Sequence, residues 1–115
     1  MVIKNGNYPT RIIKNMMGGE GKFIIEDILL PEQMNGGRLF ARGCLLPGDS
    51  VGYHEHTKDM EICYFLSGKG IVQDELGRQM EVGSGDTNIV DAGHGHAIKN
   101  NGEEPLIYIA VILFK

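Results

Sequence analysis

Apolar and alternating segments of four to nine residues follow one another along the chain, separated by glycine-containing turns. Many of them are rich in Ile, Val, Tyr and Phe, which suit a pleated sheet. Turn residues lie between the segments, as in Pro47-Gly48-Asp49 and Ser84-Gly85-Asp86. Short strands at close spacing with such turns predict an all-β sandwich or barrel. The expected segments are Lys22–Leu30, Arg38–Leu46, Met60–Leu66, Gly70–Asp74, Gln79–Val82, Thr87–Val90, Ala97–Asn100 and Leu106–Phe114.

Helical periodicity is weak throughout, and only residues 29–34 have a pattern that suits one short helical turn. The chain has no internal repeat, linker or low-complexity tract. A length of 115 residues is enough for one hydrophobic core and too short for two. We therefore expect one domain over residues 1–115.

The segment Leu106–Phe114 is apolar at nearly every position, so both faces of a strand formed there need cover. A second layer of the same chain can cover one face, as for a central strand of a sandwich. A partner subunit can cover the other. We favour a subunit interface, and thus a homodimer with two-fold symmetry, because the core of so small a domain is limited.

The net charge of −4 comes with basic residues scattered along the chain, which argues against nucleic acid as a partner. No apolar run approaches the roughly 20 residues of a membrane span, and the N-terminus lacks the apolar segment of a secretion signal. We expect a cytoplasmic protein without membrane contact, with a small molecule as its ligand. Two cysteines make no disulfide framework and would remain reduced there.

All four histidines fall in two short windows, His54-Glu55-His56 and His94-Gly95-His96. Neutral imidazole is the commonest metal ligand in proteins. On a strand, His54 and His56 share one face, and Glu61 can turn back toward them from the next strand. His96, from a distant hairpin, would add a third nitrogen. The pattern predicts one divalent transition metal ion per chain, with two octahedral positions open for water or substrate.

The spacing of these residues is more specific than a lone His-x-His. From Gly48 the chain reads five residues, His54, one, His56, four, Glu61, six, Gly68. From Gly85 it reads five residues, Asp91, one, Gly93, two, His96, three, Asn100. This pattern resembles the two signature motifs of the cupin superfamily, except that Asp91 stands where proline is usual. The 16 residues between the motifs resemble the spacer of small single-domain cupins.

The resemblance implies a conical β-barrel of jelly-roll type, also described as a double-stranded β-helix, with motifs at residues 48–68 and 85–100. Carried over position by position, the metal ligands are His54, His56, Glu61 and His96. Open octahedral positions favour Mn or Fe as the working metal, and Zn or Ni also suit these ligands. Asn100 is expected to have a structural role, by hydrogen bonding to backbone near the second motif.

Three further residues are candidates for the substrate pocket. Cys63 and Phe65 share the strand parity of Glu61 and are expected to line the cavity. For Cys63 an unreactive wall thiol is the favoured role, and a thiolate ligand or redox partner is the alternative. Arg42 would hold an anionic substrate if its strand face points inward, and otherwise lies on the surface.

Two residues next to the ligands have less certain roles. His94 is expected at the rim, where it could move protons as a catalytic group, although its glycine neighbours make strand geometry doubtful. Tyr53 has the opposite parity to the ligands and is expected to pack outside the cavity.

Fold and metal ligands do not define a reaction. The favoured hypothesis is a metal-dependent oxidoreductase, isomerase or lyase acting on a small carboxylate or sugar-like metabolite that coordinates the ion. The alternative is a non-catalytic binding or sensing protein. A sugar-phosphate isomerase or oxalate-type enzyme is a third possibility. Oxalate-converting cupins tend to have Arg or Asn three residues before the first histidine, and Val51 stands there, which disfavours oxalate.

Overall fold

The computed structural model describes residues 1–115 and contains ten β-strands and two short 3₁₀ turns. The 3₁₀ turns are η1 (Met16–Gly18) and η2 (Pro31–Gln33). The strands are β1 (Thr10–Lys14), β2 (Lys22–Leu29), β3 (Gly37–Leu45), β4 (Ser50–His56), β5 (Asp59–Ser67), β6 (Lys69–Asp74), β7 (Gln79–Gly83), β8 (Thr87–Val90), β9 (His94–Lys99) and β10 (Leu106–Phe114).

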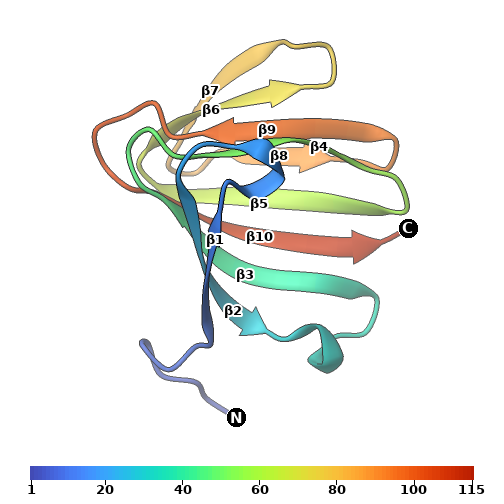
Figure 1. Ribbon diagram of the computed structural model, residues 1–115. Helices are drawn as coiled ribbons and strands as arrows, with labels where there is room; N and C mark the ends of the chain where they lie inside the picture. Colours follow the sequence, from blue (N-terminus) through green and yellow to red (C-terminus); the bar gives the residue numbers. More distant parts are fainter.

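The strands form two antiparallel sheets that face each other (Figure 1). The six-stranded sheet has the order β1-β2-β3-β10-β5-β8, and the four-stranded sheet has the order β4-β9-β6-β7. No strand pairing joins one sheet to the other, so the barrel is not closed by hydrogen bonds. The predicted all-β, double-stranded β-helix fold is confirmed.

Alternation along the strands separates a buried face from an outer face. On β10, Leu106, Tyr108, Ala110 and Ile112 point into the space between the sheets and are buried. The intervening side chains point outward and are only half-buried. β10 is thus a central strand of the six-stranded sheet, between β3 and β5, and this chain covers only its inner face.

Several predicted boundaries differ from the observed strands. β1 was not expected, and it forms the edge of the larger sheet beside β2. β9 begins at His94 rather than at Ala97, so the second histidine window belongs to a strand. The short helical turn expected within residues 29–34 is present as η2. None of the helical segments is long and apolar enough to cross a membrane.

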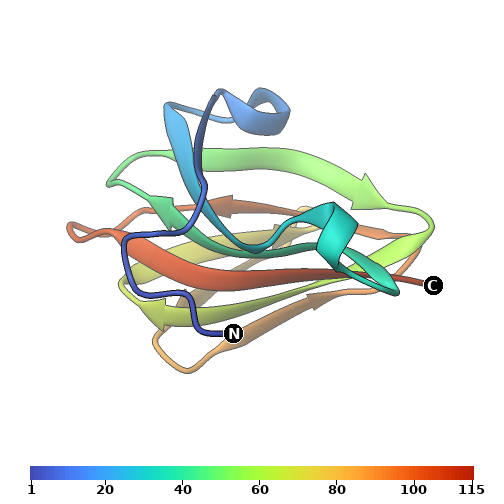
Figure 2. The ribbon, with the colours of Figure 1, turned by 90° about the horizontal axis from the view of Figure 1, so that it is seen from below.

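The turn η1 lies against β4 (Figure 2). A Cβ atom at Gly52 would lie 2.0 Å from the carbonyl oxygen of Met17, so only glycine permits this close approach of two backbones. The contact brings η1 to the strand that carries His54 and His56, and its methionines become part of the wall around the site described below.

Candidate metal centre

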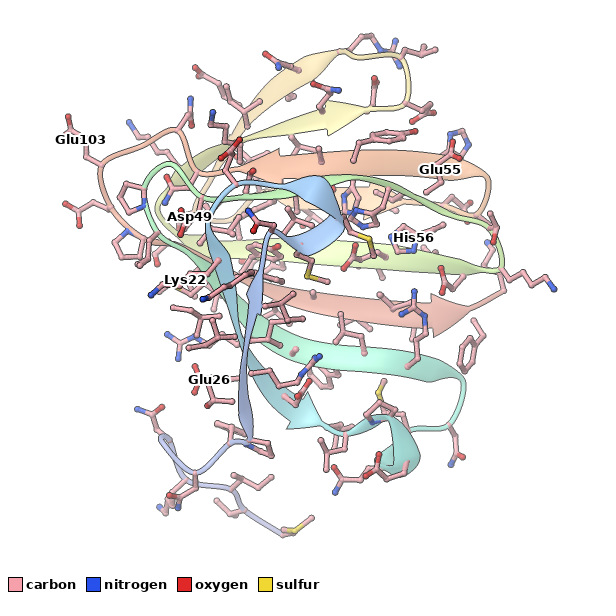
Figure 3. The ribbon with its side chains drawn as sticks, in the orientation of Figure 1. Lys22, Glu26, Asp49, Glu55, His56 and Glu103 are labelled. Carbon is pink, nitrogen blue, oxygen red and sulfur yellow. The ribbon has the colours of Figure 1, made fainter.

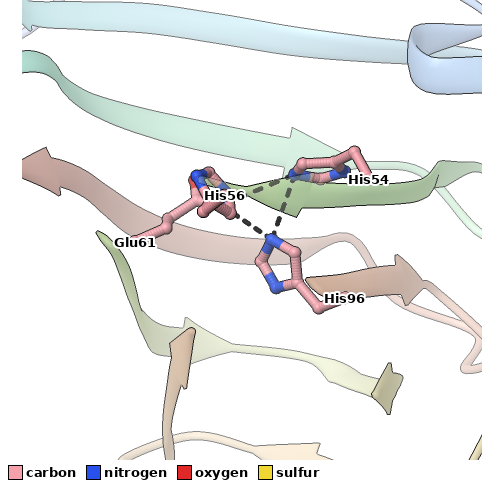
Figure 4. A group of neighbouring side chains, drawn as sticks. All are labelled: His54, His56, Glu61 and His96. Carbon is pink, nitrogen blue, oxygen red and sulfur yellow. Dashed lines mark hydrogen bonds and ion pairs between the residues drawn. The ribbon is translucent and has the colours of Figure 1, made fainter. Parts of the chain in front are cut away.

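Four side chains from both sheets converge between them: His54, His56, Glu61 and His96 (Figure 4). β4 and β9 pair so that His54 lies opposite His96, and Glu61 comes from β5 of the other sheet. One potential ligand atom from each residue lies within 4.8 Å of all the others. The four predicted ligands are therefore brought together, although they are up to 42 residues apart in the sequence.

Each histidine is oriented by an acceptor on the far side of its ring. Nδ1 of His54 donates to the Gly52 carbonyl at 2.9 Å, and Nδ1 of His56 donates to the Asp59 carboxylate at 2.7 Å. Nδ1 of His96 donates to Oδ1 of Asn88 at 2.7 Å. These bonds select the tautomer in which every Nε2 atom has a free lone pair, as in metal-ligating histidines.

The Nε2 atoms of the three histidines lack good hydrogen-bond donors. Nε2 of His54 and of His96 are 3.1 Å apart, and in this tautomer neither carries a hydrogen. Nε2 of His56 is buried and makes no hydrogen bond, although it lies 3.2 Å from Oε1 of Glu61. Three lone pairs and a carboxylate directed at one point form a donor set suited to a divalent transition ion. The residues present fit a metal.

The protonation of the cluster is set by these contacts. Burial by itself would raise the pKa of Glu61, but the proximity of its carboxylate to the rings of His54, His56 and His96 outweighs burial and holds this pKa far below the ordinary value. The Glu61 carboxylate beside its Nε2 in turn raises the pKa of His56, against the opposing effect of burial. Glu61 is thus an anion at neutral pH, as a metal ligand must be.

Three members of the cluster, His54, His56 and Glu61, line a cavity of about 490 Å³, whereas His96 lines a separate depression. Much of the cavity wall is apolar, with Phe23 and Ile25 from β2, Ala110 and Ile112 from β10, and Met16 and Met17 from η1. Arg11, Asp27 and Arg38 interrupt the apolar wall; Arg11 pairs with Asp27, and Arg38 pairs with Asp59, which lies outside the wall. The space is large enough for a small ligand in contact with His54, His56 and Glu61.

The two pairs differ in how much of the guanidinium is used. Arg11 donates from Nε and Nη2 to both oxygens of Asp27, at 2.8 and 2.9 Å, so this pair is bidentate. Arg38 donates to Asp59 through Nε alone, at 2.8 Å. Because Asp59 also accepts from His56, Arg38 is linked to the metal cluster through a single carboxylate. Despite partial burial, both bonds hold the pKa of Asp59 below its ordinary value.

A β-bulge directs Arg38 toward the cavity. The pairing of β10 with β3 shifts from Ile112↔Leu39 to Leu113↔Gly37, which leaves Arg38 as the extra residue. Strict alternation would place Arg38 on the outer face with Phe40, but a bulge re-aims the extra side chain. The sequence contains no signal for this irregularity, and our sequence analysis did not identify Arg38.

Arg42 and Val51, which entered the sequence argument about anionic substrates, are both outside the cavity wall. Arg42 lies on the outer face of β3, 3.8 Å from Glu26, so the predicted pocket role is not supported. Val51 is buried in the hydrophobic core. The residue at that position therefore provides no argument for or against a carboxylate ligand, and the cations of the cavity come from Arg11 and Arg38.

Cys63 and Phe65 have the inward parity that was predicted, but they are fully buried in the core instead of lining the cavity. Burial raises the pKa of the Cys63 thiol well above its ordinary value, so the thiolate needed for ligation or redox chemistry is disfavoured. Inward parity identified the correct face of β5, but these two residues lie farther along it than the cavity extends.

His94 is exposed and is absent from the wall of the metal cavity. Its ring pairs with Glu75, and this hydrogen bond raises the pKa of His94. The two residues lie with Asp74 and Asp91 in a separate, open depression of about 330 Å³ behind His96. The predicted position at the rim of the metal cavity is wrong, because β9 continues as a regular strand through Gly95 to His94.

Two further expectations are confirmed. Asn100 is fully buried and donates from Nδ2 to the carbonyls of Leu45 and Glu104, so its role is structural. Tyr53 is 41% exposed and lies outside the cavity, with its hydroxyl beside Glu55. In contrast, Figure 3 shows the side chain of His56, the residue after Glu55, in the interior near β4 and β5.

Sequence reasoning missed four residues of the site: Arg11, Arg38, Asp59 and Asn88. Asp59 could have been found, because it lies two residues before Glu61 and shares its face of β5. Asn88 and Arg11 come from strands whose pairing partners the sequence does not reveal.

Residues 41–112 match the family model described as the cupin domain. The chain belongs to the cupin family, and the four clustered residues occupy the ligand positions expected from its motifs.

Several proteins resemble the chain over most of its length. A curated relative from Thermotoga maritima, named an oxalate-binding protein, is 40% identical over 114 residues, which are 98% of this chain and 93% of the relative. A crystal structure described as a predicted oxalate decarboxylase from T. maritima is 39% identical, covers 100% of both chains and has a TM-score of 0.94. The cupin domain of Cnp3 from Schizosaccharomyces pombe shares the fold at 12% identity, with a TM-score of 0.74 over 91% of this chain and 69% of that one.

Proposed function

We propose that the protein binds a small dicarboxylate of the oxalate class at a divalent transition metal ion held by His54, His56, Glu61 and His96. The observation that carries the proposal is the combination, beside one cavity, of three converging imidazole lone pairs with a partly unused guanidinium. Mn or Fe is the favoured metal, since two open positions of an octahedron accept two carboxylate oxygens, and Zn or Ni are alternatives.

Arg38 supplies the charge that selects a second carboxylate. Its Nε is bound to Asp59, and no hydrogen bond within the chain occupies its two Nη groups. Guanidinium binds carboxylates through paired N–H donors, and such charge-assisted bonds are about twice as strong as neutral ones. A monocarboxylate on the metal leaves the guanidinium unused, whereas a dicarboxylate can meet both cations. The names of the two T. maritima relatives agree with this ligand class.

The cavity wall favours binding over turnover. Apart from His54, His56 and Glu61, its ionisable side chains are Arg11, Arg38 and Asp27. Arginine remains protonated at neutral pH, and the carboxylate of Asp27 is occupied by Arg11. Beyond the imidazoles of the metal cluster, no imidazole, amine or thiol lines the cavity to move a proton. This chemistry differs from our expectation of an enzyme, which rested on His94 as the proton carrier.

The second candidate function is decarboxylation of the same ligand, and Asp27 is the observation that favours it. Asp27 is 4% exposed and is the only carboxylate of the wall other than Glu61. Released from Arg11, it could exchange a proton with a bound substrate. A bound metal would supply the Lewis acidity that polarises a substrate carboxylate. We place either activity in the cytoplasm, since both cysteines are free.

The experiment is calorimetric titration of the Mn²⁺-loaded full chain with oxalate, acetate and formate. We expect oxalate to bind at least about tenfold more tightly than either monocarboxylate, from one added charge-assisted contact. Absence of oxalate binding by protein with one Mn²⁺ per chain would refute the proposal. Measuring formate and CO₂ in the same mixtures separates binding from decarboxylation.

Arg38→Met tests the part that Arg38 plays, because methionine keeps much of the length of the side chain without its charge. The variant should lose about tenfold in oxalate affinity while acetate affinity changes little. The matched control is Arg78→Met, which removes an exposed arginine paired with Asp74 on the other sheet. Metal affinity is measured for each variant, because Arg38 also contacts Asp59.

A further inference from the structure

The apolar part of the cavity wall has no counterpart in oxalate. Oxalate consists of two joined carboxylates and contains no hydrocarbon, so its contacts would be with the metal and Arg38. The cavity of about 490 Å³ lies within the size range of pockets that bury much larger molecules. Close-packed interiors leave few voids larger than a water molecule, so a hollow of this size is a feature of the site. The remaining space is therefore available to a further part of the ligand.

The floor of this space is apolar directly beside a metal ligand. Strand pairing places Ile112 of β10 between Glu61 of β5 and Leu39 of β3. In the next inward-facing row, Ala110 lies opposite Ala41, and both line the cavity. Because these two side chains are small, they leave room above the sheet, and the hollow continues from the metal centre along an apolar surface.

Part of the apolar wall is not needed for the hydrophobic core. Met17, Leu30 and Pro31 line the cavity but do not belong to the core cluster. The side chain of Met17 is 55% exposed. Removing apolar surface from water is favourable, so these side chains would gain contacts from an apolar group that enters the cavity.

The backbone of Met17 gives independent support. Its φ of 53° and ψ of 32° lie in the left-handed region, where an L side chain is disfavoured and glycine is the ordinary residue. The close approach of its carbonyl to Gly52 fixes this conformation. Residues held in such conformations cluster at ligand sites. A methionine here, at the cavity, supplies a flexible thioether chain that adapts to the shape of an apolar ligand.

We infer that the ligand is a dicarboxylate with an apolar substituent on the carbon between its carboxylates, as in a 2-alkylmalonate. This inference rests on the proposed function for the carboxylates, which meet the metal and the Nη groups of Arg38. The substituent lies along Ala41, Ala110 and Met17. The charges select the two carboxylates, and the apolar wall selects the substituent.

The test is calorimetric titration of the Mn²⁺-loaded full chain with oxalate, malonate and butylmalonate. Each buried CH₂ group contributes roughly fourfold in affinity, so butylmalonate should bind at least about tenfold more tightly than malonate. Its heat capacity change on binding should also be more negative, as apolar burial requires.

The outcomes separate this inference from the proposed function. Equal affinities for malonate and butylmalonate, or binding of oxalate without either malonate, would overturn the inference and leave the proposed function standing. Failure of all three ligands to bind would overturn the proposed function and this inference with it.

Met17→Gly separates ligand binding from stability. Glycine suits the left-handed backbone, so the thermal midpoint should not fall, whereas the ratio of butylmalonate affinity to malonate affinity should drop at least about threefold. The matched control is Met80→Ala, because Met80 is 71% exposed but lies on β7 of the other sheet, and its ratio should equal that of wild type.

Ala41→Leu is a second variant, which fills the hollow from the side of β3. It should lower the same affinity ratio, because the larger side chain occupies the place of the substituent. A ratio that both Met17→Gly and Ala41→Leu leave unchanged would contradict the proposed position of the substituent and overturn the inference.

Discussion

The two ends of the space between the sheets differ in chemistry, although the same strands build both. On β5, Glu61 points into the metal cluster, and Phe65, four residues further along, is fully buried in the core. On β10, Ile112 lines the cavity, while Tyr108 packs against Phe65 with ring centroids 5.2 Å apart. In Figure 1 the first end faces the C-terminus, and the second faces the loop before β10.

We call the end at Glu61 and Ile112 the open end, because the cavity lies there, and the end at Phe65 and Tyr108 the closed end. At the closed end, buried polar groups find hydrogen-bond partners within the chain. Asn100 bonds to the carbonyls of Leu45 and Glu104 and accepts a hydrogen bond from the amide of Gly102, which connects three segments. At the open end, the buried Nε2 of His56 has no hydrogen-bond partner. The difference indicates that the closed end provides stability, and that the open end retains unsatisfied groups for a ligand.

The largest effect is expected at the closed end. Phe65→Ala removes a ring with no exposed surface and should lower the free energy of unfolding by about 3–5 kcal/mol. Chemical denaturation measures this loss. The folded fraction should still bind one metal ion per chain. Loss of metal binding by the folded variant would show that the two ends are coupled.

The next effect is confined to the open end. Glu61→Gln keeps the shape of the side chain but removes the anionic ligand, and metal affinity should fall at least about 100-fold, beyond the effect of losing a supporting contact. Competition with a fluorescent chelator measures the affinity. The thermal midpoint of the metal-free variant should stay near that of metal-free wild type. An unchanged affinity would show that the cluster is not the metal site.

Protons should compete with the metal at the open end. The pKa of His56 is raised by Glu61, so this ring remains protonated to a higher pH than a free imidazole, and the metal must displace that proton. Affinity is therefore high above this pKa and falls as the pH drops through it. Between pH 8 and pH 5, a histidine with a pKa of about 6.5 alone predicts a loss of roughly 30-fold. Equal affinities at pH 5 and pH 8 in a Mn²⁺ titration would contradict the assignment.

The smallest effect is expected outside both ends. His94 is two residues from His96, but it is exposed and pairs with Glu75. His94→Gln should leave metal affinity within about twofold of wild type, as for surface positions in general. The same titration provides the measurement. A large decrease would place His94 within the functional cavity after all.

The metal ligands and the fold class could be predicted from the sequence because they depend on local periodicity. Residues two apart on a strand lie on the same face. This rule placed His54 with His56, and it predicted that Cys63 and Phe65 point inward like Glu61. The spacing of both motifs then predicted that His96 joins the cluster. None of these inferences requires knowledge of which strands pair.

The residues around the ligands were decided by tertiary structure. Arg38 faces the cavity only because the β3–β10 register slips at that point, and Arg11 reaches it because β1 pairs with β2. The cavity reaches Glu61 on β5 but not Cys63. Where it ends depends on the side chains of the strands that face β5. Parity along one strand identifies a face, but depth, register and bulges arise from contacts between distant segments, and these form only in the folded chain.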